Sequence, residues 1–271
     1  MPASTSGALA HIPAPANPHV NVAAADASSL SAANPVAAPA ELTNAEAARL
    51  LAGADSGVRP QPGRPAFRFV KRAFDIAASG SAIVILAVPS AILSAVIAAK
   101  SPGASPLYSQ TRVGRVNADG TYKLFRMWKF RSMVPDADAQ LAQLKHKNEA
   151  DGPLFKIKDD PRIIPGVGKF IRRHSIDELP QLLNVFMGDM SLIGPRPGLP
   201  CEVAQYDGRA KQRLTVKAGC GGVWQVGGRS DSTFNGMVDA DLEYVENCSV
   251  GYDLRLIFGT IRAMFGGGGA Y

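Results

Sequence analysis

Two adjacent carboxylates in the run "HSIDELPQLLNV", residues 174–185, are the side chains best placed to do chemistry. Asp177 and Glu178 stand directly before an apolar run, and carboxylates can act as nucleophiles or proton acceptors. They can equally begin a helix, because Ser175-x-x-Glu178 has the form of a capping box. Acidic residues in a first turn also suit the positive end of the helix dipole. On spacing alone, the structural interpretation is favoured.

The residues after the acids predict a helix and limit where it can start. Apolar side chains at helical spacing predict a buried stripe made of Leu179, Leu182, Leu183 and Phe186. With Ser175 as N-cap, Pro180 would remove a hydrogen bond from the helix. With Asp177 as N-cap, the proline falls in the first turn, where it is tolerated. Both starts stay open.

A basic run, "YKLFRMWKFRSM" at residues 122–133, predicts a strand. Alternation places Lys123, Lys129 and Arg131 on one face. Such a face could bind an anion, but a solvated edge is favoured because Lys and Arg are usually exposed.

A second basic position is held between two prolines in "GDMSLIGPRPG", residues 188–198. Pro195 fixes its own backbone, and Pro197 pushes Arg196 towards extended geometry. A guanidinium on a stiff backbone loses little entropy when it grips a phosphate with two donors. A rigid surface turn is the equal alternative.

Further cations surround the acids. Lys169, Arg172 and Arg173 precede them closely and could neutralise them or hold a diphosphate beside them. The glycine-rich run "GGVWQVGGR", residues 221–229, ends in Arg229 and could bring backbone close to a ligand, although such runs are more often plain turns.

Several function classes lack support. The chain has 271 residues and a net charge of +6, so anionic lipid, phosphorylated substrates and nucleic acid are all partners to consider. Nucleic acid is the weakest, because no DNA- or RNA-binding motif is present. Cys201, Cys220 and Cys248 have no metal-ligand spacing and fit idle thiols in a reducing compartment. His174-x-x-Asp177 is too little for a zinc site.

An apolar run at residues 74–99 carries one charge, Asp75, and is uncharged from Ile76 to Ala99. It is long enough to span a bilayer. Pro89 divides it into helical pieces of about 20 and 15 Å, each shorter than the roughly 30 Å hydrocarbon core. The sequence therefore predicts a re-entrant helical hairpin broken at Pro89, with a proline-kinked span as the alternative.

Basic residues flank this run on both sides, and positive charge marks the cytoplasmic side. They are Arg59, Arg64, Arg68, Lys71 and Arg72 before it, and Lys100, Arg112 and Arg115 after it. Both flanks are therefore expected to be cytoplasmic. Residues 1–40 have few large apolar side chains and predict disorder, followed by a short helix within 43–54 and a linker at 59–65.

The ordered set of runs resembles the bacterial sugar transferases, also called monotopic phosphoglycosyl transferases, from about Phe69 to Tyr271. The runs are "KRAFDI", "LYSQTRVGR", "FRMWKFRSM", "DPRI", "SIDELPQLLNV", "GDMSLIGPRP", "WQVGGR" and "YVEN". The sequence is most similar to short members that initiate exopolysaccharide synthesis. The resemblance implies an α/β membrane-associated fold, with an N-terminal re-entrant helical hairpin and a compact, mainly helical catalytic domain that has a small sheet.

The same resemblance implies transfer of a sugar 1-phosphate from a UDP-sugar to undecaprenyl phosphate, with Mg²⁺ as cofactor and UMP as product. Asp177 matches the family nucleophile and would contact the metal, and Glu178 matches its partner, which could cap the helix, hold Asp177 or accept a proton. Side chains expected to bind substrate are Arg172, Pro195, Arg196, Pro197, Lys129, Arg131 and Arg229. The expected domains are a tail and linker at 1–66, the membrane helix at 67–100 and a cytoplasmic catalytic domain at 101–271, on the bacterial inner membrane.

Three positions depart from the family pattern. The hairpin break, usually Ser-Pro, is Val88-Pro89 here, and an Arg-Pro-Gly run is replaced by Lys217-Ala218-Gly219. Cys248 stands where an aromatic residue is common. The transferred sugar, glucose or galactose by likeness, and any homo-oligomer stay open. A non-catalytic membrane scaffold and an aspartate-dependent phosphohydrolase are the alternative functions, the second lacking the usual Asp-x-Asp pattern.

Overall fold

Helices and two small sheets make up the part of the chain that the computed structural model describes, residues 43–62, 64–149, 152–155, 157, 159–227 and 233–265. The first elements are α1 (Asn44–Leu51), α2 (Pro65–Lys100), β1 (Leu107–Val113), β2 (Leu124–Phe130), α3 (Ala137–Leu144) and α4 (Val167–Arg173). They are followed by α5 (Gln181–Met187), β3 (Ser191–Ile193), α6 (Pro200–Val203), α7 (Gly208–Lys211), β4 (Gly219–Gly221), α8 (Val223–Val226), α9 (Phe234–Asn247) and α10 (Val250–Phe265). Short 3-10 turns lie at Lys145–Lys147, Ile176–Glu178 and Gln212–Thr215. The expected mixture of helices with a small sheet is confirmed.

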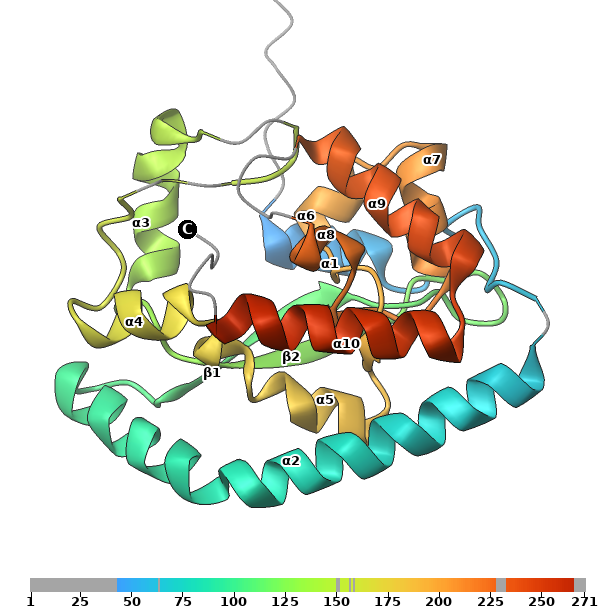
Figure 1. Ribbon diagram of the computed structural model, residues 1–271. Coiled ribbons are helices and arrows are strands. Elements are labelled where there is room, and N and C mark those ends of the chain that lie inside the picture. The colour runs from blue at the N-terminus through green and yellow to red at the C-terminus, as the bar shows by residue number, and fades with distance from the viewer. Residues whose placement is uncertain are drawn as a thin grey trace, which may run out of the picture. The chain divides into compact units, whose positions relative to one another are not determined.

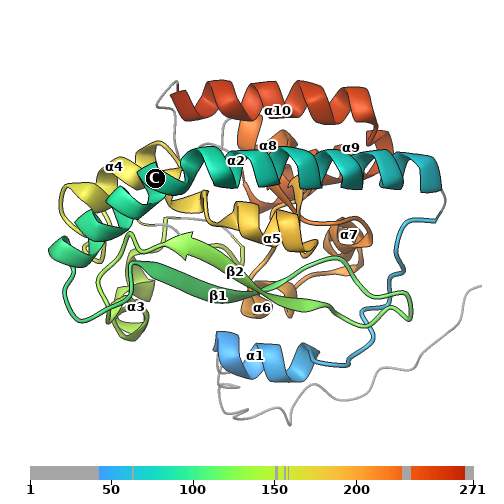
Figure 2. The ribbon, with the colours of Figure 1, turned by 90° about the horizontal axis from the view of Figure 1, so that it is seen from below.

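The strand predicted within residues 122–133 is β2, and it forms an antiparallel pair with β1. Leu107 faces Phe130 at one end of the pair, and Val113 faces Leu124 at the other. The second sheet is a short parallel pair of β3 and β4. Figure 2 shows α5 between α2 and the β1–β2 pair, with α1 on the other side of that pair.

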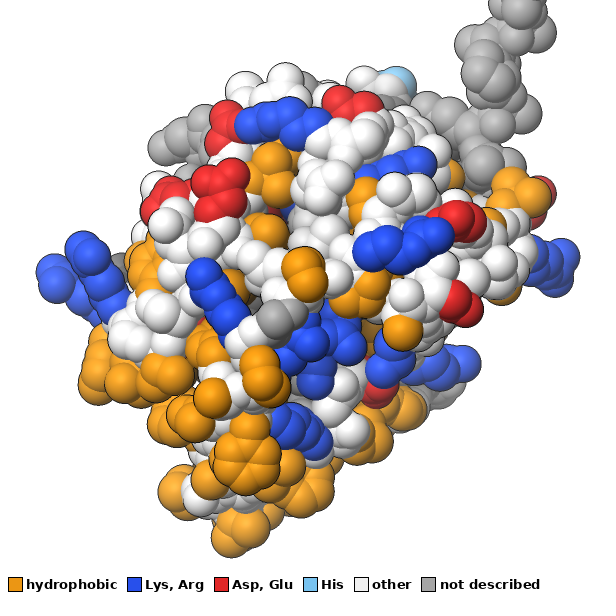
Figure 3. Space-filling model, turned by 90° about the vertical axis from the view of Figure 1, so that its right-hand side faces the viewer, with side chains coloured by type: hydrophobic (Ala, Val, Ile, Leu, Met, Phe, Trp, Pro, Cys, Tyr) orange, Lys and Arg blue, Asp and Glu red, His pale blue; other side chains and the backbone are white. Residues whose placement is uncertain are grey.

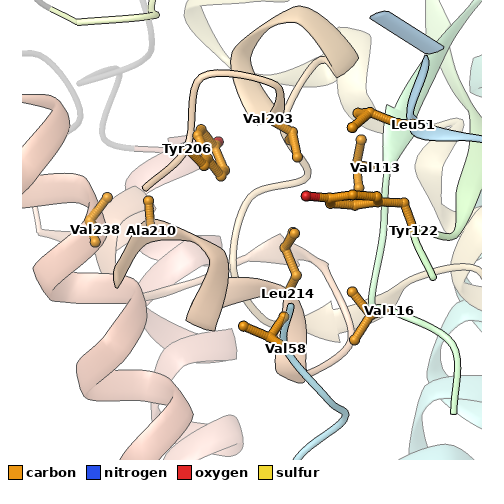
Figure 4. Close-up of a cluster of buried hydrophobic side chains, with 10 residues drawn as sticks. All are labelled: Leu51, Val58, Val113, Val116, Tyr122, Val203, Tyr206, Ala210, Leu214 and Val238. Atoms are coloured by element: carbon orange, nitrogen blue, oxygen red, sulfur yellow. The ribbon is translucent and has the colours of Figure 1, made fainter. Parts of the chain in front are cut away.

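A buried apolar cluster joins the beginning of the described chain to its middle and end (Figure 4). Its members are Leu51, Val58, Val113, Val116, Tyr122, Val203, Tyr206, Ala210, Leu214 and Val238. Helix α1 is the short helix expected within residues 43–54, and a capping box between Thr43 and Glu46 starts it. The predicted disordered tail, residues 1–40, lies outside the described residues.

Helix α2 runs without interruption through Pro89 and bends along its length (Figure 1). Proline has no N–H for the helical hydrogen bond and crowds the preceding turn, which is the usual cause of a bend. The structure therefore has one bent helix where the sequence predicts two helical pieces. Its path through a bilayer stays a prediction.

Much of α2 is apolar and exposed. Phe69, Val84 and Ile85 are each more than 70% exposed. The helix is long and apolar enough to cross a membrane, and only 6% of its most apolar stretch is buried. Burying so many large apolar side chains in lipid instead of water is favourable, so α2 is a candidate membrane segment.

Two contacts near opposite ends hold α2 to the rest of the structure. Asp75 Oδ1 accepts hydrogen bonds from Ser191 Oγ and the Leu192 N–H, both at 3.0 Å. Towards the other end, the fully buried Ile97 packs with Phe130 and neighbouring apolar side chains. The helix thus touches the same domain before and after its bend.

Candidate active site

The two acids lie in a tight turn between α4 and α5. Ser175 has a left-handed backbone (φ 53°), which is uncommon for a residue other than glycine. A 3-10 turn over Ile176–Glu178 follows, and α5 begins at Gln181 with Pro180 as its N-cap. Consecutive residues in such a turn point about 120° apart, so Asp177 and Glu178 face different directions.

Neither predicted N-cap starts α5, and the predicted capping box is wrong; Ser175 stands instead before the 3-10 turn. Ser175 makes no side-chain cap, and its carbonyl accepts the Glu178 N–H at 3.2 Å instead. The left-handed backbone of Ser175 ends α4 and does not open α5. Pro180 fits because a proline just before a helix loses no helical hydrogen bond.

The predicted apolar stripe of α5 is also wrong in part. Leu183 and Phe186 are exposed, while Asn184 is fully buried. The Asn184 side chain accepts from the Trp128 N–H at 3.0 Å and donates to the Arg126 carbonyl at 2.7 Å. These two bonds fix α5, and the turn before it, against β2.

Glu178 is held by two cations that come from different parts of the chain. Lys129 Nζ on β2 lies 2.9 Å from Glu178 Oε1, and both side chains are mostly buried. Arg196 Nη1 lies 3.7 Å from the same oxygen. Burial lowers the pKa of Lys129, and the neighbouring carboxylates oppose that change. The turn and the proline-flanked loop thereby meet at one carboxylate.

Asp177 is buried beside this ion pair, with 6% of its surface exposed. Burial raises the pKa of its carboxyl, while Lys129 and Arg172 favour its ionised form. An ionised carboxylate that has lost its water is a stronger nucleophile than a solvated one. Nearby Arg172 brings a further cation to the site from the end of α4.

The loop that carries Arg196 is rigid because its backbone is held from two sides. Arg112 Nη1 donates to the Pro197 carbonyl at 3.1 Å, and Arg213 Nη2 donates to the Arg196 carbonyl at 3.2 Å. The guanidinium of Arg196 lies over the ring of Trp224, 5.8 Å from its centre. A side chain so restrained has little entropy left to lose on binding a phosphate.

Close backbone contact fixes the start of the same loop. The Gly219 N–H donates to the Pro195 carbonyl at 2.9 Å. A Cβ on Gly219 would lie 2.0 Å from the Gly194 nitrogen, so no other residue fits there. The Lys217-Ala218-Gly219 run, although it departs from the family pattern, supplies this contact.

The predicted substrate-binding residues are only partly brought together. Lys129, Arg172 and Arg196 surround the acids, and Pro195 and Pro197 hold Arg196 in place. Arg131 is placed differently: it donates to the Ser105 carbonyl at 2.7 Å and lies against the Tyr108 ring. Arg229 lies outside the described residues.

Sequence reasoning missed two residues that position the site. Arg112 reads as a flanking charge in the sequence, yet it is buried between Pro197 and Gln110. Arg213 is buried in an ion pair with Asp241. Nothing in the local sequence around Arg112 or Arg213 marks either residue as buried.

The carboxylates of Asp177 and Glu178 are suited to a Mg²⁺ ion that a phosphate group also binds. Within the described residues, no group of three or more His, Cys, Asp or Glu side chains could hold a metal. Mg²⁺ is commonly bound through one or two carboxylates together with substrate phosphates and water. Asp177 can supply such a carboxylate, while Glu178 is engaged by Lys129 and Arg196.

Comparison with known proteins matches most of the chain. A model described as bacterial sugar transferase matches residues 66–267. The chain is 39% identical over 201 residues to the galactosyl transferase CpsE of Streptococcus agalactiae, which covers 74% of this chain and 43% of that protein. It is 39% identical over 213 residues to the undecaprenyl-phosphate galactose phosphotransferase of Salmonella typhimurium (75% and 42%). It is 35% identical over 212 residues to the exopolysaccharide production protein ExoY of Rhizobium meliloti (77% and 91%). The chain thus spans about two fifths of the first two proteins and nearly all of the third.

Proposed function

Because the chain belongs to the bacterial sugar transferase family, we propose that it transfers a sugar 1-phosphate from a UDP-sugar to undecaprenyl phosphate, in the first membrane step of exopolysaccharide synthesis. The observation that carries this proposal is the buried Asp177 beside an engaged Glu178 and a set of cations. Cations around a buried carboxylate can hold a diphosphate where that carboxylate reaches phosphorus.

The proposed reaction has two steps through a covalent intermediate. An Asp177 oxygen forms a bond to the phosphorus that carries the sugar, and the bond from that phosphorus to the bridging oxygen breaks, so UMP leaves with the electron pair. An oxygen of undecaprenyl phosphate then attacks the same phosphorus and releases the Asp177 carboxylate. In this proposal Glu178 either keeps Asp177 in position or accepts the proton of a protonated lipid phosphate.

The cations act on the charge of the diphosphate. Arg196 presents its guanidinium from a rigid loop, and Arg172 and Lys129 add positive charge at the same place. Bound through Asp177, Mg²⁺ would neutralise charge on the substrate phosphates. Together these groups reduce the repulsion between a carboxylate and the anion that it attacks.

The proposal is tested by the release of UMP from purified protein. With a UDP-hexose alone, UMP should appear in an amount near one per protein molecule, and turnover should need added undecaprenyl phosphate. A panel of UDP-hexoses and UDP-N-acetylhexosamines identifies the sugar, with UDP-glucose or UDP-galactose expected. A scaffold releases no UMP under any condition, and a phosphohydrolase turns over without the lipid, so either result rejects the proposed function.

We further propose that α2 re-enters the cytoplasmic leaflet of the inner membrane and does not cross it. A straight helix would separate Asp75 and Ile97 by about 33 Å along its axis, which exceeds the hydrocarbon core. Both residues nevertheless pack against the same domain. That arrangement supports a bent path with both ends on the catalytic side.

Cysteine labelling tests this topology. Cysteines placed at Pro62 and Ala118, both exposed, should resist a membrane-impermeant maleimide in intact cells and react after permeabilisation. Pro89→Ala should favour a straight, spanning helix and expose one of the two. Labelling of one position in the unaltered helix would establish a span.

A further inference from the structure

A cavity of about 140 Å³ lies beside the first turns of α2, at residues that do not include either acid. It is several times larger than the ~30 Å³ share of one water. Six cations line it: Arg64, Arg68, Lys71, Arg72, Arg115 and Lys217. Figure 3 shows Lys and Arg side chains gathered on this face, directly above an apolar region.

The cations at the start of α2 are poorly neutralised. They are Arg64, Arg68, Lys71 and Arg72. Within the described residues, only Lys71 among these four pairs with a carboxylate, that of Asp253 at 2.6 Å. The other three donate to backbone carbonyl oxygens: Arg64 to Cys248, Arg68 to Gln61, and Arg72 to Val185 and Phe186. A carbonyl oxygen carries only a partial charge, so the positive charge of these arginines is not cancelled.

One carboxylate lines the cavity, and it is already engaged. Asp75 is buried, and its Oδ1 accepts from Ser191 and Leu192 of β3. It therefore holds α2 to β3, and it is a single carboxylate among six cations.

The remaining two cations have no partner at all within the described part of the chain. Arg115 and Lys217 are partly buried and make no hydrogen bond or ion pair there. Burial lowers the pKa of Lys217, Arg72 and Arg115 lower it further, and Asp75 opposes that change. Burial and Arg68 likewise lower the pKa of Arg115. Both groups are in an environment that an anion would improve.

We propose that this cavity binds the phosphate group of a phosphate ester, held by Arg115 and Lys217 and faced by the arginines of α2. Guanidinium groups match the geometry of phosphate oxygens, and a lysine adds a compact charge. The cavity opens beside the exposed apolar face of α2. The phosphate can therefore belong either to an anionic phospholipid headgroup or to a soluble ligand. The site is separate from the acids and does not depend on the proposed reaction.

The test compares two double variants of the full chain, each losing two positive charges. Arg115→Gln with Lys217→Gln removes the free cations of the cavity. Arg49→Gln with Lys211→Gln removes two cations of α1 and α7 that do not line it. Binding of inorganic phosphate is measured by calorimetry in maltoside detergent, and binding to phosphatidylglycerol–phosphatidylcholine vesicles is measured by co-sedimentation, with pure phosphatidylcholine vesicles as reference.

The cavity variant should weaken binding about tenfold or more in at least one arm, because each charge-assisted bond to phosphate is strong, while the control variant binds as the unaltered chain. Loss confined to the anionic vesicles identifies a lipid headgroup, and loss in the phosphate titration identifies a soluble ligand. Equal binding by both variants, or equal loss in both, overturns the proposal. Thermal unfolding is measured for every variant. If the cavity variant does not fold, the same binding measurements compare Arg115→Gln alone with the double variant Arg115→Lys and Lys217→Arg, which keeps both charges.

Discussion

Replacing Asp177 by Asn is expected to lower turnover by about a thousandfold or more, because an amide cannot act as the proposed nucleophile. The substitution keeps the size and shape of the side chain, so the turn between α4 and α5 should persist. Asp159→Asn is the matched control: its carboxylate is exposed and lies 3.7 Å from Lys169 Nζ. The control should turn over as the unaltered protein. Release of UMP and labelling of the protein by a UDP-sugar radioactive in the sugar are measured together.

The stability of Asp177→Asn separates a chemical role from a structural one. The raised pKa means that the folded protein holds the Asp177 proton more tightly than the unfolded chain does. The stability due to this group is therefore fully present below its unfolded pKa, about 3.9, and is lost as the pH rises through the folded value. Asparagine does not titrate, so the variant should gain stability relative to the parent as the pH rises from about 4. A folded Asp177→Asn protein with full activity would refute the catalytic assignment.

The second large effect is expected at the buried ion pair of Arg213 and Asp241. Asp241 Oδ2 lies 2.5 Å from Arg213 Nη2, and both side chains are almost completely buried. Asp241→Asn leaves the arginine charged and without its carboxylate, which should cost about 3–5 kcal/mol of unfolding free energy. Asp239→Asn in the same helix is the matched control, since its pair with Arg209 is exposed, and it should change stability by less than about 1 kcal/mol. Chemical denaturation measures both.

A paired replacement shows what this ion pair does for the site. Changing Arg213 to Met together with Asp241 to Leu removes both charges, so most of the lost stability should return. The Arg196 carbonyl still loses its donor, and the loop that presents the Arg196 guanidinium should loosen. We expect the stable double variant to show a raised KM for the UDP-sugar. An unchanged KM would show that Arg213 has no part in positioning Arg196.

Some of this structure follows from local sequence rules. The run at residues 122–133 predicts β2 because apolar and basic residues alternate there, and the prolines on either side of Arg196 predict a stiff loop. The short helix predicted within residues 43–54 is α1, which a capping box between Thr43 and Glu46 opens. In each case the residues that determine the conformation are neighbours in the chain, so a short window contains the physical cause.

Other features depend on partners far away in the sequence. The left-handed backbone at Ser175 has no local signal, since only glycine reliably marks that conformation. Arg112 looks like an exposed charge until Pro197, 85 residues later, is placed beside it. The prediction that Leu183 and Phe186 are buried fails, because the rule that apolar side chains face inward does not hold beside a candidate membrane segment.

The Asn184 side chain has a consequence for the solubility and assembly of the chain. A strand at the edge of a two-stranded sheet leaves a row of free N–H and C=O groups, which can recruit a strand from another molecule. Asn184 occupies that row on β2 with one donor and one acceptor, in the way that a third strand would. On the β1 side, the Val113 N–H donates to the Gly198 carbonyl at 3.0 Å. Both edges of the small sheet are therefore closed to another copy of the chain at these positions, so aggregation through strand pairing is opposed by the same asparagine that fixes the turn carrying the two acids.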